Sequence, residues 1–326
     1  MKFPTSILAG LLCATTLAAA PLVAVQAQAQ AGKTLTMVLP FPPGGAVDGL
    51  ARVLSQELAK QEGYDAVIVD NRPGAGGQVA MNAIKAAKPD GHTIFLAHAG
   101  AYVLNRFAYD NLSYNPDKDL VPVSLVAQAP VFLLVPGTST ANSLADLLAQ
   151  GKKASLSFGS PGVGTETHLA GEVLKARAGV QGEHIPYKGA GPALVDLASG
   201  RLDFMFDVLI GSNAFLKDGR VKVLAAAAPQ RSEFLPNTPT FQELGVNDIN
   251  FQLWFGAAAP AGTPAEVANR LSQDIAKAMN KPEVIGEFAK LGMNITTSTP
   301  AQMAKLIADD VAQFEKLLQD PNIKMK

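Results

Sequence analysis

The sequence predicts an α/β protein with two domains joined by two crossing strands, and three observations support this fold class. Short runs rich in β-branched residues alternate with segments of helical periodicity, which is typical of a parallel sheet covered by helices on both faces. The alternation occurs in two separate series. The segments that join the series, Val121–Ala127 and Phe251–Ala257, are apolar and strand-like rather than rich in glycine and serine, so both are expected to cross between the domains as strands.

The individual elements follow from the same patterns in chain order. The first series is expected at Thr34–Pro40, Ala46–Gln61, Ala66–Asp70, Gln78–Ala87 and Thr93–His98. The second series is expected at Val131–Val135, Leu144–Lys152, Ser155–Ser157, Thr165–Ala178, Glu183–Tyr187, Gly191–Ser199, Phe204–Asp207 and Val221–Ala226. Three further helices are expected at Pro264–Met279, Pro282–Lys290 and Pro300–Gln319. Each has proline near its start, where the missing N–H costs least.

The two crossings divide the chain into a discontinuous domain and an inserted one. A chain that leaves the first domain near residue 128 and returns near residue 254 gives domain 1 as residues 30–128 and 254–326. Domain 2 is then residues 129–253. The two crossing strands are expected to act as the hinge.

The N-terminal segment, residues 1–29, has the layout of a secretory signal peptide. It combines Lys2, the apolar run Ile7–Ala20 and the small-residue stretch Val25–Ala29, and cleavage is expected near residues 27–31. In a Gram-negative cell, such a signal predicts that the mature protein resides in the periplasm.

Composition narrows the classes of partner. Of the 27 basic and 28 acidic residues only Lys2 lies in the signal segment, so the mature chain is close to neutral, and aromatic residues are few. This argues against nucleic acid and anionic membrane surfaces as partners. Cys13, the single cysteine, also lies in the signal segment, so the mature chain offers no disulfide and no thiol. We expect an exported monomer with a small-molecule ligand.

Three loops share one construction, in which a strand is followed by glycines and proline and then by the start of a helix. They are VLPFPPGGAVDG (38–49), FGSPGVGTETHLAGEVL (158–174) and PYKGAGPALVDL (186–197). Amides at a helix N-terminus lack intrahelical partners and carry a partial positive charge, and glycines let an anion approach them. In doubly wound sheets such loops lie where ligands bind. The loops therefore indicate an anion site built from backbone amides; the alternative is that glycine and proline merely form turns.

The sequence lacks the motifs of common enzyme and cofactor classes. It has no GxxxxGK[ST], and Val79 stands where a dinucleotide fingerprint starting at Gly74 needs Gly or Ala. Phe158 stands where a nucleophile elbow around Ser160 needs glycine. The four histidines show no metal-binding spacing. We therefore expect a protein that is not an enzyme, with no catalytic residue, no cofactor and no metal.

Several highly specific sequence blocks are distributed along the mature chain. They are PFPPGGAVDGLAR, VDNRPGAGGQVA, KPDGHTIFLA, DLVPVSLVA, FGSPGVGTETHLAGE, PYKGAGPALVDLASGRLDFMFD and PAGTPAEVANRL. With these blocks the chain resembles the Bug family of periplasmic solute-binding proteins, which are related to TctC, the citrate-binding component of a tripartite tricarboxylate transporter. The resemblance implies a periplasmic binding protein-like Venus-flytrap fold. In that fold, two α/β domains joined by two hinge strands close on a small carboxylate that is held largely by main-chain groups and water. It also implies a membrane permease as partner, but it does not identify the carboxylate.

The resemblance places the first two loops at the ligand cleft. The candidate ligand-binding residues of these loops are Phe41, Pro42, Gly44, Gly45, Ala46, Asp48, Ser160, Gly164, Thr165 and Glu166. For Asp48 two roles stay open, because a carboxylate would repel an anion: it caps the first helical turn, or it binds an ammonium or hydroxyl group of the ligand. Glu166 is either a ligand neighbour or a first-turn acid that complements the helix dipole.

Two further candidates lie at strand ends. His98 ends the strand TIFLAH, where the family often has small hydroxyl residues, so this departure is a candidate determinant of ligand choice. An imidazole there can pair with a carboxylate. Asp207 ends the run RLDFMFD, where its side chain accepts from an amine or hydroxyl of the ligand or ties down neighbouring amides.

Three classes of function stay open at this point. The first is a binding protein that delivers a carboxylate, an amino acid or an aromatic acid to a tripartite tricarboxylate-type transporter. The second is a ligand-sensing adaptor for a membrane signalling protein. The third is an exported enzyme in which Asp48, His98 or Asp207 serves as an acid or base.

Overall fold

The computed structural model describes residues 34–325, so the predicted signal peptide lies outside the described residues. The strands are β1 (Thr34–Leu39), β2 (Ala66–Asn71), β3 (Thr93–His98), β4 (Leu120–Pro136), β5 (Leu156–Ser160), β6 (Gly182–Pro186), β7 (Phe204–Val208), β8 (Val221–Ala226), β9 (Gln252–Pro260) and β10 (Asn294–Ile295). The helices are α1 (Ala46–Ala59), η1 (Ala75–Gly77), α2 (Gln78–Ala86), η2 (Gly100–Leu104), α3 (Asn105–Ala108), α4 (Pro116–Asp119), α5 (Leu144–Gly151), α6 (Glu166–Ala178), α7 (Ala190–Ala198), α8 (Leu209–Lys217), α9 (Ala265–Met279), α10 (Pro282–Lys290) and α11 (Pro300–Leu317).

The strands form two groups that alternate with helices along the chain. Their hydrogen-bonded order is β2-β1-β3-β9-β4-β7-β5-β6, and β8 and β10 both pair with β4. Strands β1, β2 and β3 are parallel to one another, and so are β5, β6 and β7. The α/β class and both predicted series of strands and helices are confirmed.

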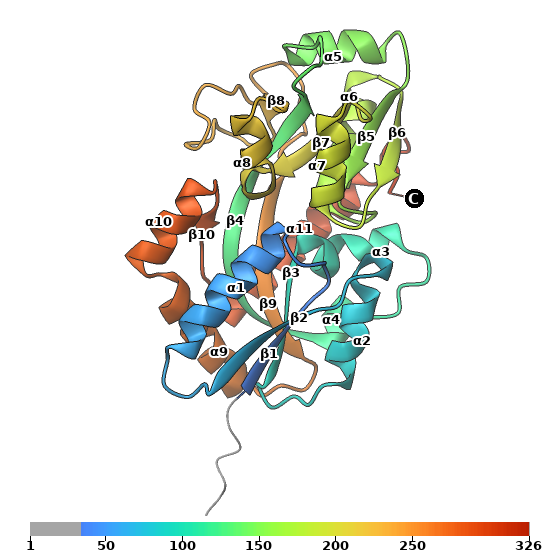
Figure 1. Ribbon diagram of the computed structural model, residues 1–326. Helices are drawn as coiled ribbons and strands as arrows, with labels where there is room; N and C mark the ends of the chain where they lie inside the picture. Colours follow the sequence, from blue (N-terminus) through green and yellow to red (C-terminus); the bar gives the residue numbers. More distant parts are fainter. Residues whose placement is uncertain (1–33, 326) are drawn as a thin grey trace, which may run out of the picture. The chain divides into compact units, whose positions relative to one another are not determined.

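Two long antiparallel strands, β4 and β9, link the two groups (Figure 1). The first part of β4 pairs with β9 as far as Pro130, and the second part pairs with β7 and β8 from Val131 onward. Gln128 lies opposite Trp254 in this ladder, at the positions where the crossings were expected. Both crossing strands are therefore present, while the domain boundaries drawn from them stay a prediction.

Buried apolar stripes explain how the helices cover the sheet. In α1 the buried residues include Val47, Leu50, Leu54 and Leu58, which recur at helical spacing and face the strands. By contrast, α6 is buried continuously from Glu166 to Leu174, so its N-terminal turn opens inside the protein rather than at its surface.

The structure differs from the predicted elements in several places, and the short elements η1, η2, α3, α4 and β10 were not predicted. The runs Val121–Ala127 and Val131–Val135 belong to a single strand, β4, with Pro130 inside it, and the helix α8 was not expected. Because Pro130 lacks an N–H, the sequence predicts that a strand ends there. In the structure, Pro130 lies within β4, where this strand changes partners from β9 to β7 and β8. Within residues 34–325, no helix combines the length and apolar character that crossing a bilayer requires.

Candidate functional site

The three glycine-bearing loops and the ends of β3, β7 and β9 surround one cavity of about 150 Å³. We call it the apolar cavity, because much of its wall is hydrocarbon. Its lining residues are Phe41, Pro42, Pro43, Gly44, Gly45, Ala46, Val47, His98, Pro161, Thr165, Glu166, Thr167, Lys188, Gly189, Ala190, Gly191, Pro192, Asp207, Val208, Leu253 and Phe255. Because β1, β3, β5, β6 and β7 all direct their carboxyl ends here, the loops that follow them meet, as expected for a doubly wound sheet.

A second cavity of about 400 Å³ shares part of this wall, and we call it the glycine-rich cavity. It shares Phe41, Pro42, His98, Pro161, Thr165, Lys188 and Gly189 with the apolar cavity. Its other lining residues are Pro40, Pro73, Gly74, Ala75, Gly76, Gly77, Ala101, Asn105, Tyr109, Gly162, Val163, Gly164, Pro186 and Tyr187. No arginine lines either cavity, so within the described chain Lys188 is the one permanently cationic side chain in their walls.

The N-terminus of α1 opens into the apolar cavity without a side-chain cap. Its N-cap residue is Gly45, and the preceding Gly44 has φ +90, a conformation that favours glycine. The first-turn amides have no intrahelical acceptor and no capping side chain to satisfy them. They are therefore free to donate to a ligand anion.

Asp48 stabilises the loop before α1 through hydrogen bonds to the protein. Its carboxylate accepts from the Gly44 N–H at 3.0 Å, from Arg52 Nε at 2.8 Å and from Asn71 Nδ2 at 3.1 Å. Although burial raises the pKa of Asp48, the hydrogen bonds from Arg52, Gly44 and Asn71 hold it below its usual range. Asp48 lines neither cavity, so its observed partners all belong to the protein and its ligand contact stays a prediction.

The N-terminus of α7 repeats the construction of α1. Its N-cap residue is Gly189, with φ +110 and no side-chain cap. The Gly189 N–H donates to the carbonyl of Pro161 at 3.0 Å, which ties the third loop to the second. A Cβ on Gly189 would lie 3.5 Å from Pro42 Cγ, so the third loop also packs against the first. Two helix N-termini capped by glycine thus flank the same cavity.

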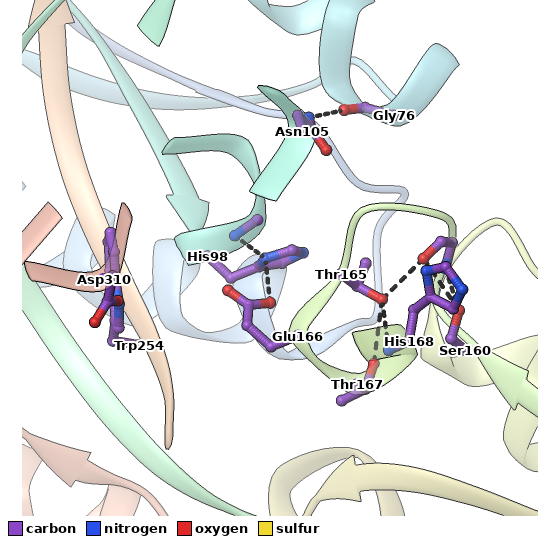
Figure 2. A network of polar contacts seen from close by, with 12 residues as sticks. Gly76, His98, Asn105, Ser160, Thr165, Glu166, Thr167, His168, Trp254 and Asp310 are labelled. Carbon is purple, nitrogen blue, oxygen red and sulfur yellow. Dashed lines mark hydrogen bonds and ion pairs between the residues drawn. The ribbon is translucent and has the colours of Figure 1, made fainter. Parts of the chain in front are cut away.

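The N-terminus of α6 is capped by its own side chains. Thr165 Oγ1 accepts from the His168 N–H at 3.2 Å, and the next residue, Glu166, places Oε2 3.0 Å from His98 Nδ1 (Figure 2). The Gly100 N–H donates to the same Nδ1 at 3.0 Å. Since one nitrogen cannot accept from Gly100 and donate to Glu166 at once, these two contacts are alternatives that depend on where the proton resides.

Ser160 lines neither cavity and contacts a pair of stacked histidines, of which His168 is buried and His184 is partly buried. Its Oγ lies 2.6 Å from His184 Nε2, and the ring of His184 stacks on His168 with centroids 3.8 Å apart. Burial, foremost, lowers the pKa of His168 to about 3 and that of His184 to about 4, so both rings are neutral near pH 7. Because Ser160 is fully buried and lines neither cavity, this serine–histidine contact is not positioned as a nucleophile for a solute there.

Asp207 contributes a buried carboxyl to the apolar cavity. It is 3 % exposed, and within the described chain its Oδ2 has no hydrogen-bond partner. Burial raises the pKa of Asp207 to about 7, although the Val208 backbone N–H opposes the shift. Glu166 in the same wall also has carboxylate oxygens without a hydrogen-bond partner, but its Oε2 lies beside the imidazole of His98, whereas Asp207 has no such neighbour within residues 34–325.

Most predicted site residues meet in these cavities. Those that line the apolar cavity are Phe41, Pro42, Gly44, Gly45, Ala46, His98, Thr165, Glu166 and Asp207. Gly164 lines the glycine-rich cavity, and Asp48 and Ser160 line neither. The geometry brings the candidates together, while ligand contact by each stays a prediction.

Sequence reasoning missed the contribution of β9. Leu253 and Phe255 on this crossing strand form apolar wall, and Tyr109 after α3 donates from its hydroxyl to the Val163 carbonyl at 3.1 Å beside the glycine-rich cavity. An apolar strand carries no local signal that two of its side chains line a cavity. Within residues 34–325, no group of three or more histidine, cysteine, aspartate or glutamate side chains is arranged to hold a metal ion.

Comparison with known proteins agrees with this architecture. A model of the family described as "Tripartite tricarboxylate transporter family receptor" matches residues 50–323. The chain belongs to this family. The protein BugT of Bordetella pertussis is 32% identical over 320 residues, covering 97% of each chain. The family consists of receptors and binding proteins, so the expectation of a solute-binding protein rather than an enzyme is confirmed.

Two solved structures of proteins from Rhodopseudomonas palustris are similar to this chain in fold. Rpa4515, determined with adipate, is 30% identical with a TM-score of 0.84 and matches 88% of this chain and 96% of its own. MatC (Rpa3494), with bound malate, is 30% identical with a TM-score of 0.82, and the match covers 87% of this chain and 98% of MatC. The predicted two-domain binding-protein fold of this TctC-like member of the Bug group is thereby confirmed.

Proposed function

We propose that this protein captures a small carboxylate in the periplasm and delivers it to the membrane permease of a tripartite tricarboxylate-type transporter. The observation that carries the proposal is the pair of helix N-termini, at α1 and α7, that open into one cavity with glycine at both N-caps. Each presents amides without intrahelical acceptors, and the helix dipoles favour an anion between them.

The energies of these contacts suffice without an arginine. A helix terminus contributes about 0.3–1 kcal/mol, rising to ~2 kcal/mol when partly buried. Each hydrogen bond to a charged group adds roughly 1.5–3 kcal/mol. Several amides together therefore reach the ~8 kcal/mol that corresponds to micromolar affinity.

The relatives support the class of ligand. Rpa4515 was determined with adipate and MatC with malate. Adipate and malate each carry carboxylates that such amides can hold. At 30% identity these ligands indicate a carboxylate for this protein but do not choose one.

Delivery requires that the site open and close. We assign the closing motion to β4 and β9, the crossing strands, with the domains divided at residues 128 and 253. The contacts from Tyr109 to Val163 and from His98 to Glu166 link the proposed domains at the cavity edge, and they would form only when the domains close.

Mass spectrometry of the denatured protein, followed by calorimetry with each acid found, tests the proposal. We expect a copurified carboxylate that rebinds with micromolar or better affinity. Binding of neutral solutes with no affinity for any carboxylate would overturn it. For the permease, solute uptake into vesicles that contain it should require this protein.

A further inference from the structure

Asp207 and Glu166 both bring buried carboxyl oxygens without a hydrogen-bond partner to the apolar cavity, but Glu166 Oε2 lies 3.0 Å from His98 Nδ1, whereas Asp207 has no charged partner among residues 34–325. Asp207 is 3 % exposed, it lines the apolar cavity, and its Oδ2 lacks a hydrogen-bond partner among residues 34–325. A buried polar atom without a partner is costly, and such atoms are rare in folded proteins. This acceptor therefore calls for a donor that the described chain does not supply.

The other charged groups in the cavity wall do not meet this need. His98 Nδ1 has two alternative partners in the protein, Glu166 Oε2 and the Gly100 N–H, each at 3.0 Å, and Lys188 is exposed to solvent. Within the described residues no ion pair includes Asp207. Asp207 can donate to a ligand carboxylate only while it is protonated; once ionised, above its pKa of about 7, the buried carboxylate accepts hydrogen bonds only.

The carboxyl is also fixed in place. A Cβ on Gly211 would lie only 2.8 Å from Asp207 Oδ2, so the first turn of α8 packs directly against it. The cavity wall also includes Val208, Leu253 and Phe255, none of which offers a polar side chain, and no hydrogen bond within residues 34–325 reaches Oδ2. A group that satisfies Oδ2 must therefore come from the cavity itself.

We propose that Asp207 accepts a hydrogen bond from a hydroxyl or ammonium group on the apolar body of the ligand, so that the preferred solute is a hydroxy- or amino-substituted carboxylate. The proposal rests on the proposed function, because the carboxylate of the same ligand occupies the amides of α1 and α7. An unsubstituted acid leaves the buried acceptor unpaired, which costs about tenfold to a hundredfold in affinity.

Matched ligands test this inference. Calorimetry compares sets that share a carbon skeleton: 4-methylpentanoate with its 2-hydroxy and 2-amino forms, succinate with malate and aspartate, and benzoate with 4-hydroxy- and 4-aminobenzoate. We expect the substituted member of at least one set to bind ten times or more tighter than the plain acid. The hydroxyl and amino arms show which donor is used.

Two variants connect the preference to Asp207. Asp207→Asn keeps the shape but offers an N–H₂ group to the ligand, so the preference should fall to less than threefold. The matched control is Asp310→Asn, since Asp310 is also a partly buried acid, with a pKa that burial raises to about 6, but it lines no part of the apolar cavity. It should keep the full preference. Gly211→Ala, which displaces the carboxyl without removing it, should weaken the preference.

The outcomes separate this inference from the proposed function. If plain and substituted acids bind equally well, Asp207 does not recognise a donor group on the ligand, and this inference is wrong. The proposal that the protein captures a carboxylate is not affected by that result. The same conclusion follows if Asp207→Asn keeps the preference. If no acid of any set binds, the proposed function itself fails.

Discussion

His98 and Glu166 join two elements that are far apart in the sequence, with Nδ1 of the imidazole 3.0 Å from Oε2 of the carboxylate. His98 ends β3 and Glu166 begins α6, and their side chains are 9% and 2% exposed. The pair lies in the wall of the apolar cavity, which the N-terminal residues of α1 and the buried Asp207 also line. It therefore joins the two strand groups at the wall of the candidate site.

We first predict that this pair stabilises the fold cooperatively. Glu166→Gln or His98→Gln alone should each reduce the free energy of unfolding, by about 3 kcal/mol where a buried charge loses its partner. The double variant should cost less than the sum, with a coupling of about 1 kcal/mol or more. Urea denaturation of the four proteins measures this.

A matched control for that cycle is the exposed pair Lys305 and Asp309, whose side chains are 75% and 60% exposed. It should show a coupling below about 0.5 kcal/mol. Additive effects at His98 and Glu166 would show that their proximity carries no interaction.

A second prediction concerns the glycines at the helix N-termini. A Cβ on Gly45 or Gly191 meets no protein atom within 4 Å, and both residues line the apolar cavity. Gly45→Ala and Gly191→Ala should therefore fold normally while the new methyl group blocks the approach of the carboxylate. We expect affinity to fall tenfold or more by calorimetry, with the melting temperature nearly unchanged.

The control for the glycine variants is Gly286→Ala in α10, which also has open space around its added Cβ but lies outside both cavities. It should bind like the parent protein. Parental affinity in both Gly45→Ala and Gly191→Ala would show that the ligand does not approach these amides.

The stacked histidines predict a loss of stability in acid. Burial lowers the pKa of His168 to about 3 and of His184 to about 4, below the 6.5 of the unfolded chain. Their stabilising contribution is therefore complete above about pH 6.5 and is lost progressively as the pH falls toward 4 and 3. In His168→Gln the free energy of unfolding should depend less steeply on pH in this window.

The exposed His92 provides the comparison, and His92→Gln should keep the parental pH dependence. A parental slope in His168→Gln as well would mean that the stacked histidines do not titrate as described.

Asp207 predicts a pH dependence of the opposite sign. Its pKa of about 7 in the fold lies above the 3.8 of the unfolded chain, so the folded state holds the proton more tightly. This contribution to stability is present in full below about pH 3.8 and is lost as the pH rises through 7. Asp207→Asn should be more stable than the parent at pH 8, and the difference should shrink toward pH 5. An unstable Asp207→Asn at pH 8 would contradict the account.

Much of the fold could be predicted from sequence because strands, helices and their caps leave local patterns. The strand Thr93–His98 was predicted to the residue, and the glycines before α1 and α7 marked helix starts that do flank one cavity. These are properties of neighbouring residues. Helix α8 was missed because it follows β7 directly, with no glycine or proline between them.

The roles of individual side chains depend on partners distant in sequence. Asp48 resembles a ligand group until Asn71, 23 residues on, is seen to bind it. Ser160 sits in a glycine-rich loop, yet its hydroxyl contacts His184, 24 residues away. Only the folded chain decides whether such polar groups face a solute or one another.

The central claim is that backbone amides at the starts of α1 and α7 hold the carboxylate of the solute. A crystal structure of the protein with the acid it retains on purification tests this most directly. We predict that a carboxylate oxygen lies about 3 Å from the amide nitrogens of Gly45 or Ala46 and of Gly191. A solute lodged away from both helix starts, or held by the Lys188 side chain alone, would contradict the account.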